Sequence, residues 1–407
     1  MNAMELENRH SARNYVPLPV VLARGQGAHL WDTTGRRYID MMSAYSAASH
    51  GHAHPRLIAA LETQARRLAV PSRAYYNDRL GPFLAELTRL TSLDAALPMN
   101  TGAEAVETAI KAARRWGYRV KGVPRDRAEI IVMDGNFHGR TTTIISFSSE
   151  PDYREGFGPL TPGFRRVPFG DLSALQQAIK PETVAVLVEP IQGEAGIIVP
   201  PPGWLSGVRL LCDAHRLLMI VDEVQSGLGR TGTWFAFEHE NVRPDGVVLG
   251  KALGGGLLPV SAFVARREVM DVFTPGSHGS TFGGNPLAAA VGLEALQVIA
   301  DEGLVERSRV LGEHMLERLR AIRSPVLREV RGRGLWVGAE IDPRFAAARR
   351  ACEALLAKGV LSKETHQTVV RLAPPLVIAR EDLDLALDRF AEVVLDLERK
   401  RPPLAAA

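Results

Sequence analysis

One lysine in an otherwise apolar run is the first residue of this sequence that could do chemistry. Lys251 lies in VVLGKALGGGLLPVSA, residues 247–262, with no other charged residue and directly before a Gly-rich stretch. Lysine is rarely buried without a partner. An apolar environment favours the uncharged amine, which is the form that attacks a carbonyl group. The run therefore indicates an amine that could form a Schiff base.

Three further apolar runs end in polar side chains. Runs that are continuous and rich in Val, Ile and Leu are typical of parallel strands buried on both faces. In such sheets the ligand crevice lies beyond the carboxyl ends of the strands, so the polar strand ends predict one site. The runs are 128–137, 183–191, 217–225 and 245–253, and their polar ends are Asn136 to His138, Glu189, Asp222 to Gln225, and Lys251.

The segment MNTGAEAVETAIKAARRWG predicts a helix that begins with an anion site. Thr101 and Glu104 fit a capping box, and Gly117 is expected to end the helix. Gly102 would let the backbone approach a ligand closely, at the helix end where free N–H groups favour a phosphate. Taken alone, the pattern is also that of an ordinary capped helix.

Other candidate residues could each have a binding role or an ordinary structural role when they are considered singly. Asp222 could hold a protonated ring nitrogen, bind a metal or cap a turn. Phe137 could stack on a planar ring, and Arg140 offers a fork for a carboxylate but could be a surface ion pair. Ser280 and Thr281, in SHGSTFGGNP, could donate to phosphate oxygens or simply form a tight turn.

Several function classes find no support in the sequence. The 49 basic and 46 acidic side chains nearly balance, so neither a nucleic-acid nor a membrane partner is expected. Lys251 lacks the glycines of a nucleotide-binding loop, and GRGLWVG is not a dinucleotide fingerprint. His50, His52 and His54 alternate without a nearby acidic or Cys ligand, so no metal site is expected. Two cysteines, no apolar signal segment and no spanning run predict a cytoplasmic protein.

The order of the apolar runs predicts an α/β architecture. A large domain over about 50–290 would hold a mostly parallel central sheet flanked by helices. A smaller α+β domain would combine the N-terminal segment 1–49 with residues 291–407. Within the latter we expect a long helix over 287–322, two short strands and a C-terminal helix from Arg380.

Together, a lysine, an acid, an aromatic ring, a phosphate nest and an arginine are what a pyridoxal phosphate enzyme needs. The sequence resembles the class III, fold-type I aminotransferases over nearly its whole length, about Asn14 to Arg380. The most specific segments are NYVPLPV, SAYSAASHGHAHP, LPMNTGAEAVETAIKAARRWGY, NFHGRTTTIISFS, GFGPLTPGF, VEPIQGEAGIIVPP, DEVQSGLGRTG, LGKALGGG, GSHGSTFGGNP and RLAPPLVI. The resemblance implies the fold-type I architecture and pyridoxal 5′-phosphate as cofactor.

The resemblance implies roles for the cofactor residues. Lys251 would form the Schiff base and shuttle a proton between substrate and cofactor, Asp222 would pair with the pyridine nitrogen, and Gln225 would bond the ring hydroxyl. Phe137 would stack on the ring, Gly102 and Ala103 would hold the phosphate, and Glu189 would be a hydrogen-bonding support. The other expected cofactor-binding residues are Thr101, His138, Ser280 and Thr281. In this family the last two reach the phosphate from the neighbouring subunit, which implies a homodimer with a shared site. Glu223 is expected to be structural.

The resemblance also implies a substrate. Tyr15 and Tyr45 match positions that receive the α-amino-acid end of ornithine, and Arg140 matches a carboxylate clamp. Glu194 matches an acid that pairs with Arg371 and swings away when 2-oxoglutarate binds.

The expected activity transfers the δ-amino group of L-ornithine to 2-oxoglutarate, giving glutamate 5-semialdehyde and glutamate and linking arginine and proline metabolism. The alternatives are another ω-aminotransferase acting on N-acetylornithine, lysine or 4-aminobutyrate, a pyridoxal phosphate enzyme without an amino acceptor, and a non-catalytic protein.

Overall fold

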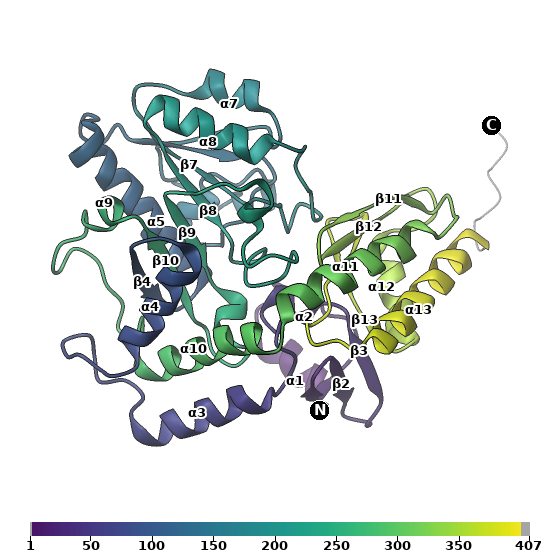
Figure 1. The fold of residues 1–407 in the computed structure, drawn as a ribbon. Helices are drawn as coiled ribbons and strands as arrows, with labels where there is room; N and C mark the ends of the chain where they lie inside the picture. Colours follow the sequence, from purple (N-terminus) through teal and green to yellow (C-terminus); the bar gives the residue numbers. More distant parts are fainter. Residues whose placement is uncertain (1, 400–407) are drawn as a thin grey trace.

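A seven-stranded sheet forms the centre of the protein, and a computed structural model describes residues 2–399. Figure 1 shows this sheet in the larger part of the molecule, with helices on either side. Its strands, in spatial order, are β4 (Ala95–Met99), β10 (Ser261–Ala265), β9 (Gly246–Leu249), β8 (Leu218–Asp222), β7 (Thr183–Val188), β5 (Glu129–Met133) and β6 (Phe164–Val167). From β9 to β6 every neighbouring pair is parallel, and β10 runs antiparallel to β9 and β4. The expected mostly parallel sheet is confirmed.

Both faces of this sheet are buried, which explains the continuous apolar runs. Along β8, Leu218 and Ile220 pack in one cluster with α5 (Gly102–Trp116), while Met219 and Val221 pack in another with α8 (Trp204–His215). Since successive side chains of a strand point to opposite faces, a strand covered on both sides has no polar positions until it ends.

Two four-stranded sheets make up the smaller part of the molecule. One has the order β1 (Leu22–Gln26), β2 (His29–Asp32), β3 (Arg37–Asp40) and β13 (Val360–Leu361); the other has β11 (Leu327–Gly332), β12 (Val337–Ile341), β15 (Val369–Leu372) and β14 (Lys363–Thr365). The parallel pairing of β3 with β13 supports joining the N-terminal segment to the C-terminal part. The boundaries 1–49, 50–290 and 291–407 stay a prediction, and residues 1 and 400–407 lie outside the described residues.

The remaining helices cover the sheets and connect them (Figure 1). They are α1 (Ala3–His10), α2 (Ser43–Ser46), α3 (Pro55–Arg67), α4 (Leu80–Thr91), α6 (Thr142–Ile145), α7 (Leu172–Ala178), α9 (Arg267–Met270), α10 (Pro286–Asp301), α11 (Leu304–Arg320), α12 (Ala348–Ala357) and α13 (Arg380–Arg399). Short turns of other helix types are η1 (Gly117–Lys121), η2 (Pro151–Tyr153), η3 (Ala236–Glu240) and η4 (Lys251–Gly254). No helix within residues 2–399 is long and apolar enough to cross a membrane.

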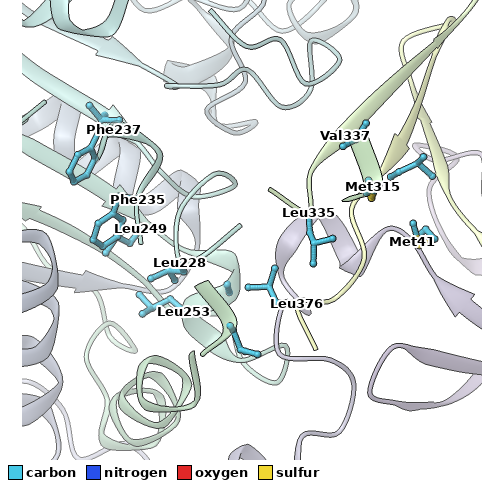
Figure 2. Packing of buried hydrophobic residues seen from close by; sticks show 14 of the residues in the cluster. Met41, Leu228, Phe235, Phe237, Leu249, Leu253, Met315, Leu335, Val337 and Leu376 are labelled. Carbon is cyan, nitrogen blue, oxygen red and sulfur yellow. The ribbon is translucent and has the colours of Figure 1, made fainter. Parts of the chain in front are cut away.

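One hydrophobic core runs from the larger part into the smaller part. Figure 2 shows Leu228 and Leu253 of the larger part facing Leu376 and Leu335, with Met315 beyond them, and all belong to one cluster of buried residues. The two parts are therefore packed together, and a site between them has rigid walls.

One helix prediction was wrong, and another missed how the chain continues after the helix. The expected helix 287–322 is two helices, α10 and α11, because Gly303 adopts a left-handed φ of 60° between them. α5 ends at Trp116 with Gly117 as its C-cap, as predicted, but Gly117 keeps helical φ and ψ angles and the chain continues through the π-helical turn η1 to Gly122, which has a φ of 82°. A Cβ on Gly117 would lie 2.3 Å from Val184 Cγ1, so this glycine serves the close approach of helix and sheet.

Candidate active site

The carboxyl ends of three neighbouring strands converge on one cavity. Glu189 directly follows β7, Asp222 is the last residue of β8, and Lys251 opens η4 two residues after β9. The cavity measures about 160 Å³. It is lined by Gly102, Ala103, Phe137, His138, Gly139, Glu189, Ile191, Asp222, Val224, Gln225, Ser226 and Lys251. Eight of the cofactor residues expected from the sequence thus line the same cavity. Four further lining residues were not predicted: Gly139, Ile191, Val224 and Ser226.

Lys251 reaches the cavity from a backbone turn that L-residues rarely adopt. Its φ is 45°, which turns the chain from β9 into η4 at a cost that local packing must offset. Burial lowers the pKa of Lys251 to about 8, with Arg371 adding to the effect and Glu194 and Asp222 opposing it. About a tenth of the amine is therefore uncharged at pH 7, far more than for an exposed lysine.

Asp222, His138 and Glu189 form a buried charged group beside Lys251. The His138 ring nitrogen Nδ1 lies 2.7 Å from Asp222 Oδ2, while Asp222 Oδ1 accepts a hydrogen bond from the Val224 backbone. Burial lowers the pKa of His138, but the hydrogen bond and the charge of Asp222 outweigh it and raise the pKa overall. Burial raises the pKa of Glu189 to about 7, although it accepts hydrogen bonds from the Phe137 and Gly193 backbones.

The start of α5 has the capping box predicted for it. The Thr101 hydroxyl accepts from the Glu104 backbone at 3.3 Å, and the Glu104 carboxylate accepts from the Thr101 backbone at 3.0 Å. Gly102 and Ala103 line the cavity directly after this cap, where helix N–H groups have no intrahelical partner. An anionic group in the cavity would meet these N–H groups and the positive end of the helix dipole.

Arg371 and Glu194 form a partly buried ion pair next to Gln225 of the cavity wall. Arg371 Nη2 lies 3.0 Å from Glu194 Oε1, and Arg371 is 1% exposed. Gln225 bridges the pair, since its Oε1 accepts from Arg371 at 2.8 Å and its Nε2 donates to Glu194 at 3.3 Å. Burial raises the pKa of Glu194, but the charges of Arg371 and Lys251 outweigh it and lower the pKa overall.

Tyr45 faces this ion pair from a strained turn. The φ angles of Ser43 to Ser46 are 42°, 47°, 59° and 77°, an unusual left-handed run without glycine. The Tyr45 ring centroid lies 5.8 Å from Lys251 Nζ and 4.9 Å from Arg371 Cζ. Tyr15, by contrast, is 77% exposed on the N-terminal segment and makes no hydrogen bond with these residues within 2–399.

Arg140 lies next to two aromatic rings, and one of them, Phe137, lines the cavity. Its Cζ is 3.6 Å from the centroid of the Tyr153 ring and 5.6 Å from that of Phe137. Tyr153 was not foreseen, because an aromatic residue between Pro, Gly and charged residues in EPDYREGFG shows no periodicity that would mark it.

The remaining candidates lie outside the cavity of their own chain. The Ser280 hydroxyl accepts from the Asn100 side chain at 2.9 Å, close to the start of α5, and Thr281 is exposed. His50, His52 and His54 have different partners, namely the Ala295 carbonyl, Asp40 and Glu302. Glu223 accepts from Ser226 and from the Phe237 backbone, away from the cavity centre.

The residues present fit pyridoxal phosphate. One cavity is lined by a lysine with a lowered pKa, the N-terminal residues of a helix, a carboxylate and an aromatic ring. Each reactive group of the cofactor has a suitable partner here: the helix N-terminus for its phosphate, the carboxylate for its basic ring nitrogen and the lysine for its aldehyde. The fold and the site define a lysine-dependent enzyme built on a mostly parallel α/β sheet.

Comparison with known proteins gives the family. Residues 10–394 match the sequence profile of the family described as aminotransferase class-III. The chain belongs to the class-III aminotransferases, whose chemistry depends on pyridoxal phosphate.

Relatives with known names align with this chain over nearly its whole length. The chain is 54% identical to an ornithine aminotransferase of Brevibacillus brevis, covering 96% of this chain and 97% of the relative. A solved structure of the Toxoplasma gondii ornithine aminotransferase, described with partial occupancy of PLP at its active site, aligns with a TM-score of 0.96 at 44% identity over 98% of this chain and 94% of that one. An acetylornithine aminotransferase structure from Elizabethkingia anophelis aligns with a TM-score of 0.89 at 48% identity over 97% and 98%.

Proposed function

We propose that this enzyme transfers the δ-amino group of L-ornithine to 2-oxoglutarate, giving glutamate 5-semialdehyde and glutamate. The observation that carries the proposal is the ion pair between the buried Arg371 and the partly buried Glu194, whose charges both act on Lys251. The similarity to ornithine aminotransferases over nearly the whole chain supports it. When bound, pyridoxal phosphate supplies an aldehyde for the amine and a ring that draws electrons from the reacting carbon.

Lys251 holds and moves the proton at the reacting carbon. Its pKa of about 8 lets its amine gain and lose a proton near neutral pH. Asp222 would hold a positive charge on the ring nitrogen of the bound cofactor, and His138 fixes this carboxylate through the 2.7 Å hydrogen bond. Gly102 and Ala103, at the start of α5, would offer backbone N–H groups to its phosphate.

The Glu194–Arg371 pair decides which end of ornithine reaches Lys251. While Glu194 neutralises Arg371, no free cation draws the α-carboxylate toward the reacting end. The α-carboxylate goes to Arg140, and Tyr45, with Tyr15, contacts the same end of the substrate. When 2-oxoglutarate follows, Glu194 turns away and Arg371 binds its α-carboxylate.

N-acetylornithine is the second candidate donor. The 48% identity to an acetylornithine aminotransferase structure favours it. An acylated α-amine would lose its polar contact with the tyrosines, which is the reason for placing free ornithine first.

The proposal includes a homodimer. Thr281 and the neighbouring Phe282, which is 56% exposed, lie on the surface of the single chain. We infer that Ser280 and Thr281 reach the phosphate of the partner subunit. A cytoplasmic location and the lack of a nucleic-acid partner stay predictions from composition.

Isotope transfer tests the proposed reaction. The enzyme is incubated with 2-oxoglutarate and ornithine carrying ¹⁵N at either the δ or the α position. We expect the label in glutamate from the δ-labelled donor alone. Label from the α position, or no label in glutamate, would overturn the proposed regiochemistry or the proposed acceptor.

A further inference from the structure

Arg140 is held by aromatic rings and not by a counter-charge. Its guanidinium carbon lies 3.6 Å from the Tyr153 ring centroid, a direct stacking distance, and the Phe137 ring is more distant at 5.6 Å. Within residues 2–399 no carboxylate lies within ion-pair distance of Arg140, whereas Arg165 and Arg166 on β6 are each paired with a carboxylate. A stacked guanidinium keeps its N–H edge available for a planar carboxylate.

Tyr153 is itself fixed at this place. It ends the short turn η2, and its ring packs edge-on against Phe137 at 6.1 Å between centroids, with an interplanar angle of 79°. Phe137 lines the cavity beside Lys251. One aromatic contact therefore connects the residue proposed to stack on the cofactor with the residue that stacks on Arg140.

The hydroxyl of Tyr153 is affected by charges on both sides of the proposed substrate site. Burial raises the pKa of Tyr153, Arg140 lowers it through its charge and a side-chain hydrogen bond, and the charge of Glu194 raises it. Tyr153 is thus close enough to Arg140 and to Glu194 for both charges to act on it.

We propose that Tyr153 is the positioning residue for Arg140, and that it sets the affinity for the α-carboxylate of the amino donor. This inference rests on the proposed function, in which Arg140 binds that carboxylate. The stacked ring fixes the plane of the guanidinium, so that both N–H groups of its edge meet the two carboxylate oxygens together.

Three substitutions of Tyr153 test the role of the ring. Tyr153→Leu should raise the KM for ornithine about fivefold with kcat changed less than twofold, because the contact acts on a remote part of the substrate. Tyr153→Gln, which lacks the ring but keeps the reach, should behave like Tyr153→Leu. Tyr153→Phe keeps the ring and should restore the KM to within about twofold of the unsubstituted enzyme. A KM that rises as much in Tyr153→Phe as in Tyr153→Leu would overturn the proposal.

A double-substitution cycle with Arg140→Gln separates positioning from a merely structural role. If Tyr153 acts through Arg140, adding Tyr153→Leu to Arg140→Gln should change the KM less than twofold. The same fivefold rise in both backgrounds would contradict the inference. The absorbance of the bound cofactor serves as the check that each variant is folded.

Failure of the proposed function is recognised separately. The unsubstituted enzyme would then not turn over ornithine, and the cycle would be measured with the carboxylate-bearing donor that it does use. Coupling between Tyr153 and Arg140 with that donor would support the inference, and additive effects would overturn it.

Discussion

The charges of Lys251 and Glu194 affect each other, yet the proposed function requires opposite protonation behaviour of the two residues. Lys251 must lose its proton to react, and burial in the cavity lowers its pKa to about 8 for that purpose. Glu194 must stay ionised to neutralise Arg371, and the charges of Arg371 and Lys251 lower its pKa although burial alone would raise it. The pKa values of these two neighbouring residues are thus shifted in the directions that their proposed roles require.

The pKa of Lys251 predicts a pH dependence for its reactivity. In the protein stripped of cofactor, the rate of amine modification by trinitrobenzenesulfonate should rise with pH, with a midpoint near 8, and level off above it. The sign follows because only the unprotonated amine attacks, and it accumulates above the pKa. Lys251→Arg provides the background from the other lysines. A midpoint near that of an exposed lysine, about 10.4, would contradict the account.

Removing the charge of Glu194 should change which amine reacts. In Glu194→Ala and in Glu194→Gln, Arg371 is no longer neutralised and draws the α-carboxylate to the reacting end. We expect nitrogen from α-¹⁵N-ornithine to appear in glutamate at least tenfold above the level of the unsubstituted enzyme. Label that still comes from the δ position alone would show that the ion pair does not set the orientation.

At the scale of elements, the sequence predicted helices and strands correctly where a local pattern of residues determines the structure. The apolar runs that end at Glu189, Asp222 and Lys251 are buried on both faces of the sheet, and their ends therefore mark its carboxyl edge. The capping box at Thr101 was likewise visible, since it involves residues only three positions apart. The break between α10 and α11 and the π-helical turn after α5 were not predicted, because they depend on what each glycine does in the fold: Gly303 takes a left-handed φ, and Gly117 meets β7.

Gly117 gives a prediction at this scale. Gly117→Ala places a Cβ 2.3 Å from the buried Val184, so the substitution should destabilise the protein by about 1–3 kcal/mol although alanine favours helix. Gly81→Ala in α4 is the matched control, because nothing lies within 4 Å of its added Cβ and stability should not fall. Thermal unfolding measures both. Equal melting temperatures for the two variants would contradict the close approach of α5 and β7.

At the scale of the whole molecule, the site is assembled from parts that no local pattern connects. Tyr45 comes from a left-handed turn near the N-terminus, which is tied down by hydrogen bonds from the buried Arg230 and to Asp40. Arg371 comes from β15 in the smaller part, and Tyr153 from a loop of the larger part. The family resemblance implied the first two, whereas Tyr153 required the fold, because only its contact with Arg140 marks it.

Preference for free ornithine is the central claim, since the cofactor site is common to all class-III aminotransferases. The direct measurement is the ratio of kcat/KM for L-ornithine to kcat/KM for N-acetylornithine, with 2-oxoglutarate as acceptor. We predict a ratio of at least about ten, equivalent to roughly 1.4 kcal/mol of transition-state binding at the end that Tyr45 contacts. A ratio below about one tenth would contradict the account and assign the enzyme to the acetylated donor.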